Sequence, residues 1–198
     1  MEVHIVLTIG LTGDVGAGKS TLSRVLKRLG ATVFDADSVA RNLWKLSEVR
    51  RAAEKRWGKD FFKDKNSVVY SKIANIIFND EDEYEFVTKL LHKRTLDELK
   101  SLIEESDGLV IVEIPLLFEC GISDWFDGIV YVAADIDKRS ELIARRNWNL
   151  EEVQRREAKM MSREEKMSRS DWILENKGSL KEWKAKSKEL GKLLLSKV

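Results

Sequence analysis

The chain has 198 residues, of which 43% are apolar, so it is long enough for one globular domain with a proper core. It carries 35 Lys and Arg against 34 Asp and Glu, and this balance gives no net field that would favour nucleic acid or a membrane surface. No run of about 18 apolar residues and no export signal occur, and Cys120 is the single cysteine. We therefore expect a soluble protein of the reducing cytoplasm.

The first predicted element is a buried strand over Val3–Ile9, a short apolar stretch that is partly β-branched. Residues 13–21 follow and fit the phosphate-binding loop pattern G-x-x-x-x-G-K-[ST]. Apolar residues then recur at helical spacing from Leu22 to Leu29, and Gly30 is a natural helix stop. Because strand, loop and helix occur in the order that the motif requires, we favour a phosphate site over a glycine-rich turn that binds nothing.

The residue types of this loop explain how it would hold a nucleotide. Its glycines allow successive N–H groups to point into one concavity, and the helix N-terminus behind it adds partial positive charge. Lys19 can reach the β- and γ-phosphates, and the Ser20 hydroxyl can bind Mg²⁺. The residues that we expect to contact ATP here are Gly13, Asp14, Val15, Gly16, Ala17, Gly18, Lys19, Ser20 and Thr21.

Four further strands are predicted, and helical patterns separate most of them. This alternation predicts an α/β protein with a parallel, doubly wound sheet. Residues 37–107 and 137–170 are too long for simple crossovers and have helical patterns, and the second stretch is rich in Arg and Lys. We interpret them as a substrate-binding insertion and a lid whose closure excludes water from phosphoryl transfer. The four strands are expected at Ala31–Phe34, Leu109–Ile114, Ile129–Ala133 and Trp172–Leu174.

Two acids, Asp35 and Asp37, follow the second predicted strand. Ligands collect at the carboxyl ends of strands in open α/β sheets. One acid can therefore take the proton of an acceptor hydroxyl while the other holds a Mg²⁺-bound water. Helix capping is the alternative role for an Asp at this position, but beside a phosphate loop we favour function.

A Pro-Leu-Leu-Phe-Glu segment follows the third strand at residues 115–119. Glu119 can order Mg²⁺ or water, and a surface salt bridge is the alternative. After the fourth strand, Asp135 is better explained as a helix cap than as a ligand. The apolar residues that can wall an acceptor pocket are Pro115, Leu116, Leu117 and Phe118.

The predicted lid begins with a basic helical stretch that includes Arg145 and Arg146. Positive groups stabilise the charge that spreads over the γ-phosphate in the transition state, so we expect one or two lid cations to be catalytic and the rest to form a solvated face. His92 lies in an apolar-rich helical stretch, where a lone His is usually structural, and no His or Cys cluster with metal-ligand spacing occurs.

Together these segments resemble the dephospho-coenzyme A kinase family. The matching pieces keep the family's order over nearly the whole chain: Leu-Thr-Gly at 11–13 with the phosphate loop, Asp-Ala-Asp at 35–37 running into Ala40 and Arg41, Leu-Leu-His at 90–92, the 115–119 segment, and Asn-Lys-Gly at 176–178. The resemblance implies transfer of the γ-phosphate of ATP, with Mg²⁺, to the ribose 3′-hydroxyl of dephospho-coenzyme A. It also implies one P-loop kinase domain with a five-stranded parallel sheet: core 1–36, 108–136 and 171–198, coenzyme-binding region 37–107 and lid 137–170.

The resemblance further implies roles for single residues. Asp37 corresponds to the base, Arg146 to the lid arginine, and Asn176 and Gly178 to residues near the adenine. Arg41, His92 and residues 115–119 are implied on the coenzyme side, although His-Lys at 92–93 replaces the family's usual His-Pro. We expect a monomer whose partners are ATP and dephospho-coenzyme A, with neither nucleic acid nor membrane.

Two other functions fit the same core. Another small-molecule P-loop kinase, such as a nucleoside monophosphate kinase, would need arginines that clamp an acceptor phosphate, and residues 37–107 contain several, among them Arg50 and Arg51. A regulatory ATP-binding module would instead hydrolyse ATP slowly and bind a protein. The predicted lid argues against that module, because a lid serves transfer to a bound acceptor.

Overall fold

A computed structural model describes residues 6–64, 66–144, 153–154, 157–158 and 160–198. Contacts divide the chain into two compact units: residues 1–35 with 105–198, and residues 36–104. Within the described residues, no helix is both long enough and apolar enough to cross a bilayer.

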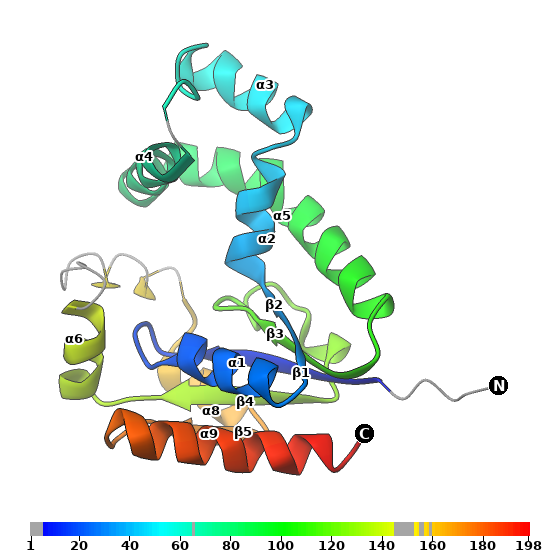
Figure 1. The fold of residues 1–198 in the computed structure, drawn as a ribbon. Coiled ribbons are helices and arrows are strands. Elements are labelled where there is room, and N and C mark those ends of the chain that lie inside the picture. Colours follow the sequence, from blue (N-terminus) through cyan, green and yellow to red (C-terminus); the bar gives the residue numbers. More distant parts are fainter. Residues whose placement is uncertain (1–5, 65, 145–152, 155–156, 159) are drawn as a thin grey trace. The chain divides into compact units, whose positions relative to one another are not determined.

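A five-stranded, wholly parallel sheet forms the first unit, in the order β2-β3-β1-β4-β5 (Figure 1). This confirms the predicted α/β class and all five predicted strands. Near-continuous apolar runs form these strands because helices cover a parallel sheet on both faces. The strands are β1 Val6–Gly13, β2 Thr32–Asp35, β3 Gly108–Glu113, β4 Gly128–Ala133 and β5 Trp172–Glu175.

The first strand extends further than predicted, because β1 ends at Gly13 and not at Ile9. Gly10 pairs with Val112 of β3 and with Ile129 of β4, so it lies in the middle of the sheet. A Cβ atom at Gly10 would lie 2.5 Å from Leu117 Cδ1, and this close approach explains a glycine inside a strand. The expected start, at residues 3–5, lies outside the described residues.

Helices α1 and α9 lie side by side on one face of the sheet, where both contact β3 (Figure 1). A capping box at Ser179 and Glu182 starts α9: the Ser179 hydroxyl accepts from Glu182 N, and the Glu182 carboxylate accepts from Ser179 N. The described helices of this unit are α1 Lys19–Arg28, the 3₁₀ turn η1 Ser123–Trp125, α6 Ile136–Ala144, α8 Arg163–Ser168 and α9 Leu180–Leu195.

The core of the first unit lies between the sheet and these two helices. Leu22 and Leu26 of α1 and Leu194 of α9 are almost completely buried against the central strands. Each fully buried Leu of this kind contributes about 1.5–3 kcal/mol by leaving water. This packing fixes the loop between β1 and α1, because both of its flanking elements are buried.

The second unit is helical, as predicted for this stretch, and has its own core. Trp44, Val49, Ala53, Ile73 and Leu91 are among its buried residues. Tertiary packing holds these helices together, since α5 packs against both α2 and α4. The helices are α2 Ala36–Leu43, α3 Ser47–Trp57, α4 Asn66–Asn79 and α5 Glu81–Glu104.

An aromatic cluster closes one end of this helical core. The Trp57 ring centroid lies 4.6 Å from that of Phe61 and 5.7 Å from that of Phe86. Glu83 accepts hydrogen bonds from Trp57 Nε1 at 2.7 Å and from Arg56 Nε at 2.8 Å, and these bonds lower its pKa. The cluster therefore ties α3 to the first turn of α5.

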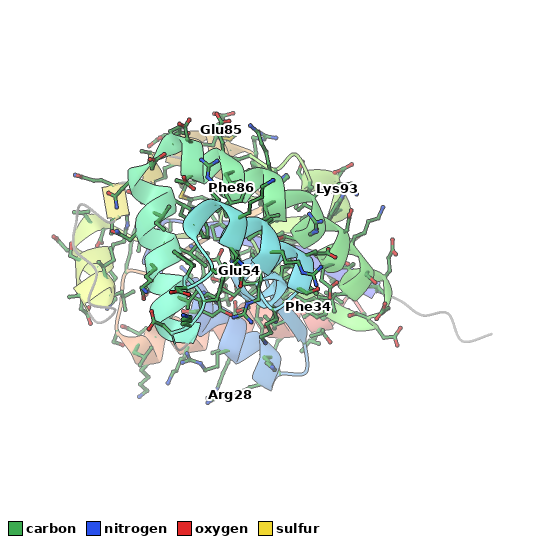
Figure 2. The ribbon with its side chains drawn as sticks, turned by 90° about the horizontal axis from the view of Figure 1, so that it is seen from above. Arg28, Phe34, Glu54, Glu85, Phe86 and Lys93 are labelled. Atoms are coloured by element: carbon green, nitrogen blue, oxygen red, sulfur yellow. The ribbon has the colours of Figure 1, made fainter. Side chains whose placement is uncertain are left out.

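The opposite face of α5 is a solvated charged surface. Glu85 and Lys93 extend outward from α5 (Figure 2). Each forms an i,i+4 ion pair, with Lys89 and Asp97 respectively. Such exposed pairs contribute little to stability because water and salt screen them, so burial of the other face of α5 stabilises its packing in the unit.

Candidate functional site

The loop at residues 13–18 turns sharply between β1 and α1. Gly13, Gly16 and Gly18 all have positive φ, at 141°, 79° and 99°. Gly13 is the most restricted, because a Cβ atom there would lie 2.2 Å from the Val132 carbonyl oxygen. Gly18 is the N-cap of α1, so the loop leads directly into the positive end of that helix.

Lys19 reaches back over this loop. Its Nζ donates to the carbonyl oxygens of Gly13 and Asp14, each at 2.9 Å. The ammonium is therefore held at the loop that is predicted to take phosphate. Ser20 is the second residue of α1 and is half-buried.

The Asp14 side chain turns toward the end of β4. Its Oδ1 accepts from the Tyr131 hydroxyl, and its Oδ2 accepts from Ala134 N at 3.0 Å. Arg163 Nη1 lies 3.5 Å from the same Oδ2. Burial, followed by the hydrogen bond to Asp14, raises the pKa of Tyr131, so this hydroxyl stays protonated and donates.

Two acids end neighbouring strands at the carboxyl edge of the sheet. Asp35 is the last residue of β2 and stands in register with Glu113, the last residue of β3. Glu113 Oε2 accepts from Ser23 Oγ of α1 at 2.8 Å, which places it beside the helix that follows the loop. Our sequence analysis missed Glu113. The sequence could have indicated Glu113, because it is an acid that directly follows the apolar run 109–112, and P-loop enzymes use an acidic residue to hold Mg²⁺.

Asp37 lies in the first turn of α2, at the start of the second unit. A carboxylate in a first turn also interacts favourably with the helix dipole. The helix-cap interpretation is confirmed for Asp135, whose Oδ1 accepts from Lys138 N at 2.8 Å in the first turn of α6.

The 115–119 segment is anchored by a buried lysine. Lys166 of α8 is 1% exposed, and its Nζ donates to the Pro115 carbonyl at 2.8 Å and pairs with Glu119 Oε1 at 2.7 Å. Thr12 Oγ1 donates to the same carbonyl at 3.1 Å, and Met161 N donates to Glu119 Oε1 at 2.7 Å. Glu119 thus forms the salt bridge that was one of its two expected roles, although its partner is interior.

The apolar members of this segment differ in exposure. Leu117 and Phe118 are buried, at 0% and 4% exposure. Phe118 packs under the Arg169 guanidinium, whose Cζ lies 4.7 Å from the ring centroid. Pro115 and Leu116 are only half-buried, so they have surface to offer a ligand.

A hollow of about 250 Å³ opens beside the loop at the start of α9. Asn176 Nδ2 donates to the Ala17 carbonyl at 2.9 Å, and Trp183 Nε1 donates to the Gly18 carbonyl at 3.3 Å. Asn176 is 2% exposed, and its Oδ1 has no hydrogen-bond partner among the described residues. The hollow is lined by Glu175, Asn176, Lys177, Gly178, Glu182, Trp183 and Lys186.

The remaining predicted residues are distributed as follows. Arg41 and His92 are exposed on α2 and α5 of the second unit, where Arg41 Nη2 donates to Ser38 Oγ at 2.9 Å. Arg145 and Arg146 lie outside the described residues. Arg139, one of the basic residues of the predicted lid, is buried on α6 and donates from Nε to the Val15 carbonyl at 2.9 Å.

A family model for dephospho-CoA kinase matches residues 7–182. The chain belongs to the dephospho-CoA kinase family. The dephospho-CoA kinase of Geobacillus kaustophilus is 34% identical over 183 residues, which cover 89% of this chain and 90% of the relative. The crystal structure of the Thermus thermophilus protein TT1252 is similar with a TM-score of 0.76 and 30% identity, covering 94% of this chain and 97% of that one.

Dephospho-CoA kinase of Campylobacter jejuni has the same fold, with a TM-score of 0.66 at 18% identity, over 96% of this chain and 98% of that one. The family match includes the loop at 13–21, the second unit and Asn176. The chain is therefore a kinase of this family, and its expected P-loop core is confirmed.

Proposed function

We propose that this chain transfers the γ-phosphoryl group of ATP to the ribose 3′-hydroxyl of dephospho-coenzyme A, giving coenzyme A and ADP. The observation that carries this proposal is the dephospho-CoA kinase match over residues 7–182, which extends well beyond the phosphate loop. In this reaction the 3′-oxygen bonds to the γ-phosphorus, and the bond to the β,γ-bridging oxygen breaks. The hydroxyl proton passes to a carboxylate, and ADP leaves with the electron pair.

ATP is proposed to bind along the loop and the hollow beside it. Backbone N–H groups of the loop that do not already donate to carbonyls face the phosphates, and Lys19 moves from the loop carbonyls to the phosphate oxygens. The adenine enters the hollow formed by residues 175–178 and α9, next to Asn176 and Gly178. Asn176 supports this placement, because its buried Oδ1 needs a donor and its Nδ2 already holds the loop.

Mg²⁺ is proposed to bind at the end of β2 and the start of α1. Ser20 and Asp35 supply oxygen donors, and Glu113 offers a second carboxylate in register with Asp35. This set fits Mg²⁺, which usually takes one or two carboxylates, substrate phosphates and water. When bound, the ion neutralises negative charge on the β- and γ-phosphates.

We propose roles toward the acceptor for single residues of the chain. Asp37 accepts the proton of the 3′-hydroxyl, and Arg41 and His92 lie on the coenzyme side. Pro115, Leu116, Leu117, Phe118 and Glu119 form a wall. Arg146, from the predicted lid, stabilises the charge of the transferring group. The enzyme is proposed to act as a cytoplasmic monomer, consistent with its single, unbridged cysteine.

A coupled assay of ADP release with a panel of acceptors tests the proposal. Dephospho-coenzyme A should drive ADP release, while AMP, CMP, adenosine and shikimate should not. Faster turnover of AMP would instead establish a nucleoside monophosphate kinase. ADP release that does not depend on any acceptor would favour a regulatory ATP-binding module.

A further inference from the structure

The phosphate loop of this chain contains a buried carboxylate. Asp14 is the second residue of the loop, and its side chain is 4% exposed. A carboxylate in this place opposes the proposed task of the loop, because it repels the phosphates that the loop N–H groups attract. Burial strengthens the repulsion, since little water is available to screen it.

Neutral donors satisfy the hydrogen bonds of this carboxylate but leave its charge in place. The Tyr131 hydroxyl and Ala134 N occupy Oδ1 and Oδ2. Neither group carries a formal charge, because the pKa of Tyr131 is raised by burial and by this same hydrogen bond. In the part of the chain that the structure describes, the Asp14 carboxylate forms an ion pair with Arg163, at 3.5 Å, while Lys19 Nζ lies at the Asp14 backbone carbonyl.

Arg163 is held in place at its guanidinium and at its backbone. Its Nη1 also donates to the Ala134 carbonyl at 3.2 Å, so the guanidinium contacts Ala134 and Asp14 together. Its backbone begins α8, where Ser162 caps the helix, and the next turn is anchored by the buried Lys166. The Arg163 side chain is 38% exposed, so it contacts the Asp14 carboxylate on one side and water on the other.

We propose that Arg163 is the counter-charge of the phosphate loop: it cancels the charge of Asp14 and so permits the loop to bind the phosphates of ATP. Arg163 acts through Asp14 and is thus a positioning residue. The inference rests on the proposed function only in taking ATP as the ligand of the loop. It implies that the affinity lost by removing the Arg163 charge is recovered when the Asp14 charge is removed with it.

A set of four proteins tests this dependence: the wild type, Arg163→Met, Asp14→Asn and the double variant. Calorimetric titration with Mg²⁺–ATP gives the Kd of each, and thermal unfolding without ATP reports folding. An uncompensated charge at about 10 Å from a phosphate, at an effective dielectric constant of about 20, weakens binding about tenfold. Arg163→Met should therefore raise the Kd about tenfold. Asp14→Asn removes the negative charge and keeps Arg163, so it should bind Mg²⁺–ATP more tightly than the wild type.

The double variant decides the mechanism. Counter-charge action predicts that adding Asp14→Asn to Arg163→Met returns the Kd to within about twofold of the wild type, because both charges are then absent. If the double variant binds as weakly as Arg163→Met, Arg163 contacts the phosphates itself or serves only the fold, and the inference is wrong. An unchanged Kd in Arg163→Met also overturns it. Arg169→Met, which removes a cation from the end of the same helix without an Asp14 contact, is the matched control and should leave the Kd unchanged.

Two further outcomes keep the test independent of folding and of the acceptor. If Arg163→Met does not fold, Arg163→Gln and Arg163→Lys replace it. Arg163→Gln should weaken ATP binding and Arg163→Lys should preserve it, and equal losses of affinity would contradict the proposal.

A wild type that binds ATP but does not phosphorylate dephospho-coenzyme A would refute the proposed function while leaving this inference intact. A wild type that does not bind ATP would refute both.

Discussion

Lys19 is the residue whose role is most directly testable. Its ammonium lies at the loop carbonyls and is expected to neutralise charge on the transferring phosphate. Lys19→Ala should lower kcat by at least about two orders of magnitude, on the order of 3 kcal/mol of transition-state stabilisation. Steady-state kinetics measures the effect, and the thermal unfolding curve should change little. A folded variant with wild-type kcat would show that the loop is not catalytic.

The two acids around the start of α2 are expected to differ in function. Asp37→Asn keeps the size and removes the charge, so it should lower kcat sharply while the Kd for ATP changes little. Asp35→Asn should instead raise the Mg²⁺ concentration that is needed for the half-maximal rate, since Asp35 is proposed to bind the ion. Positioning can matter more than basicity in a loose transition state. A large kcat loss in Asp35→Asn with a near-normal Asp37→Asn would reverse the assignment.

Tyr131 links the loop to the stability of the protein at alkaline pH. Its folded-state pKa is raised above the ordinary value of 10.0, so above pH 10.0 the unfolded chain loses this proton while the folded protein keeps it. The stabilisation by Tyr131 is thus complete below pH 10.0 and declines above it, by about 1.4 kcal/mol per pH unit. Urea unfolding from pH 9 to 11 should show this extra slope in the wild type and not in Tyr131→Phe. Parallel curves would show that the buried Tyr131 hydroxyl does not produce this slope.

At the scale of elements, the Lys166–Glu119 pair joins α8 to the segment after β3. Lys166 is 1% exposed, but 19% of the Glu119 side chain is exposed, so a Glu119 charge left alone is partly solvated. Lys166→Met also removes the hydrogen bond to the Pro115 carbonyl, so it should destabilise the protein by about 1.5–3 kcal/mol, as measured by the free energy of unfolding in urea. Lys166→Met combined with Glu119→Gln should recover much of that loss, because Gln still accepts from Met161 N and no charge is stranded. A double variant no more stable than Lys166→Met would show that packing, and not charge, is lost.

At the scale of the whole molecule, the two units are expected to respond to different ligands. The loop at 13–21 and residues 175–178 lie in the first unit, while residues 36–104 form the second. Mg²⁺–ATP alone should slow hydrogen exchange at the loop amides, because the phosphates engage them, and leave α3 and α4 unchanged. Dephospho-coenzyme A should slow exchange within residues 36–104. Equal protection of both units by ATP alone would contradict this division of substrates.

The sequence by itself determined the α/β class, the five strands, the phosphate loop and the helical nature of residues 37–107. These features depend on local patterns, since a strand, an amphipathic helix or a glycine-rich loop is encoded by consecutive residues. The end of β1 was misjudged because Gly10 and Gly13 have the composition of a loop, and only the neighbouring strands reveal that Gly10 belongs to the sheet.

Only the tertiary structure decided which side chains meet. Asp14 finds Tyr131 and Ala134 across 117 and 120 residues, and Lys166 finds Pro115 across 51. These contacts follow from the strand order β2-β3-β1-β4-β5, which differs from the order along the chain. The same strand order sets Glu113 beside Asp35. A local pattern contains no information on such pairings, because they arise when distant segments share the burial of one sheet.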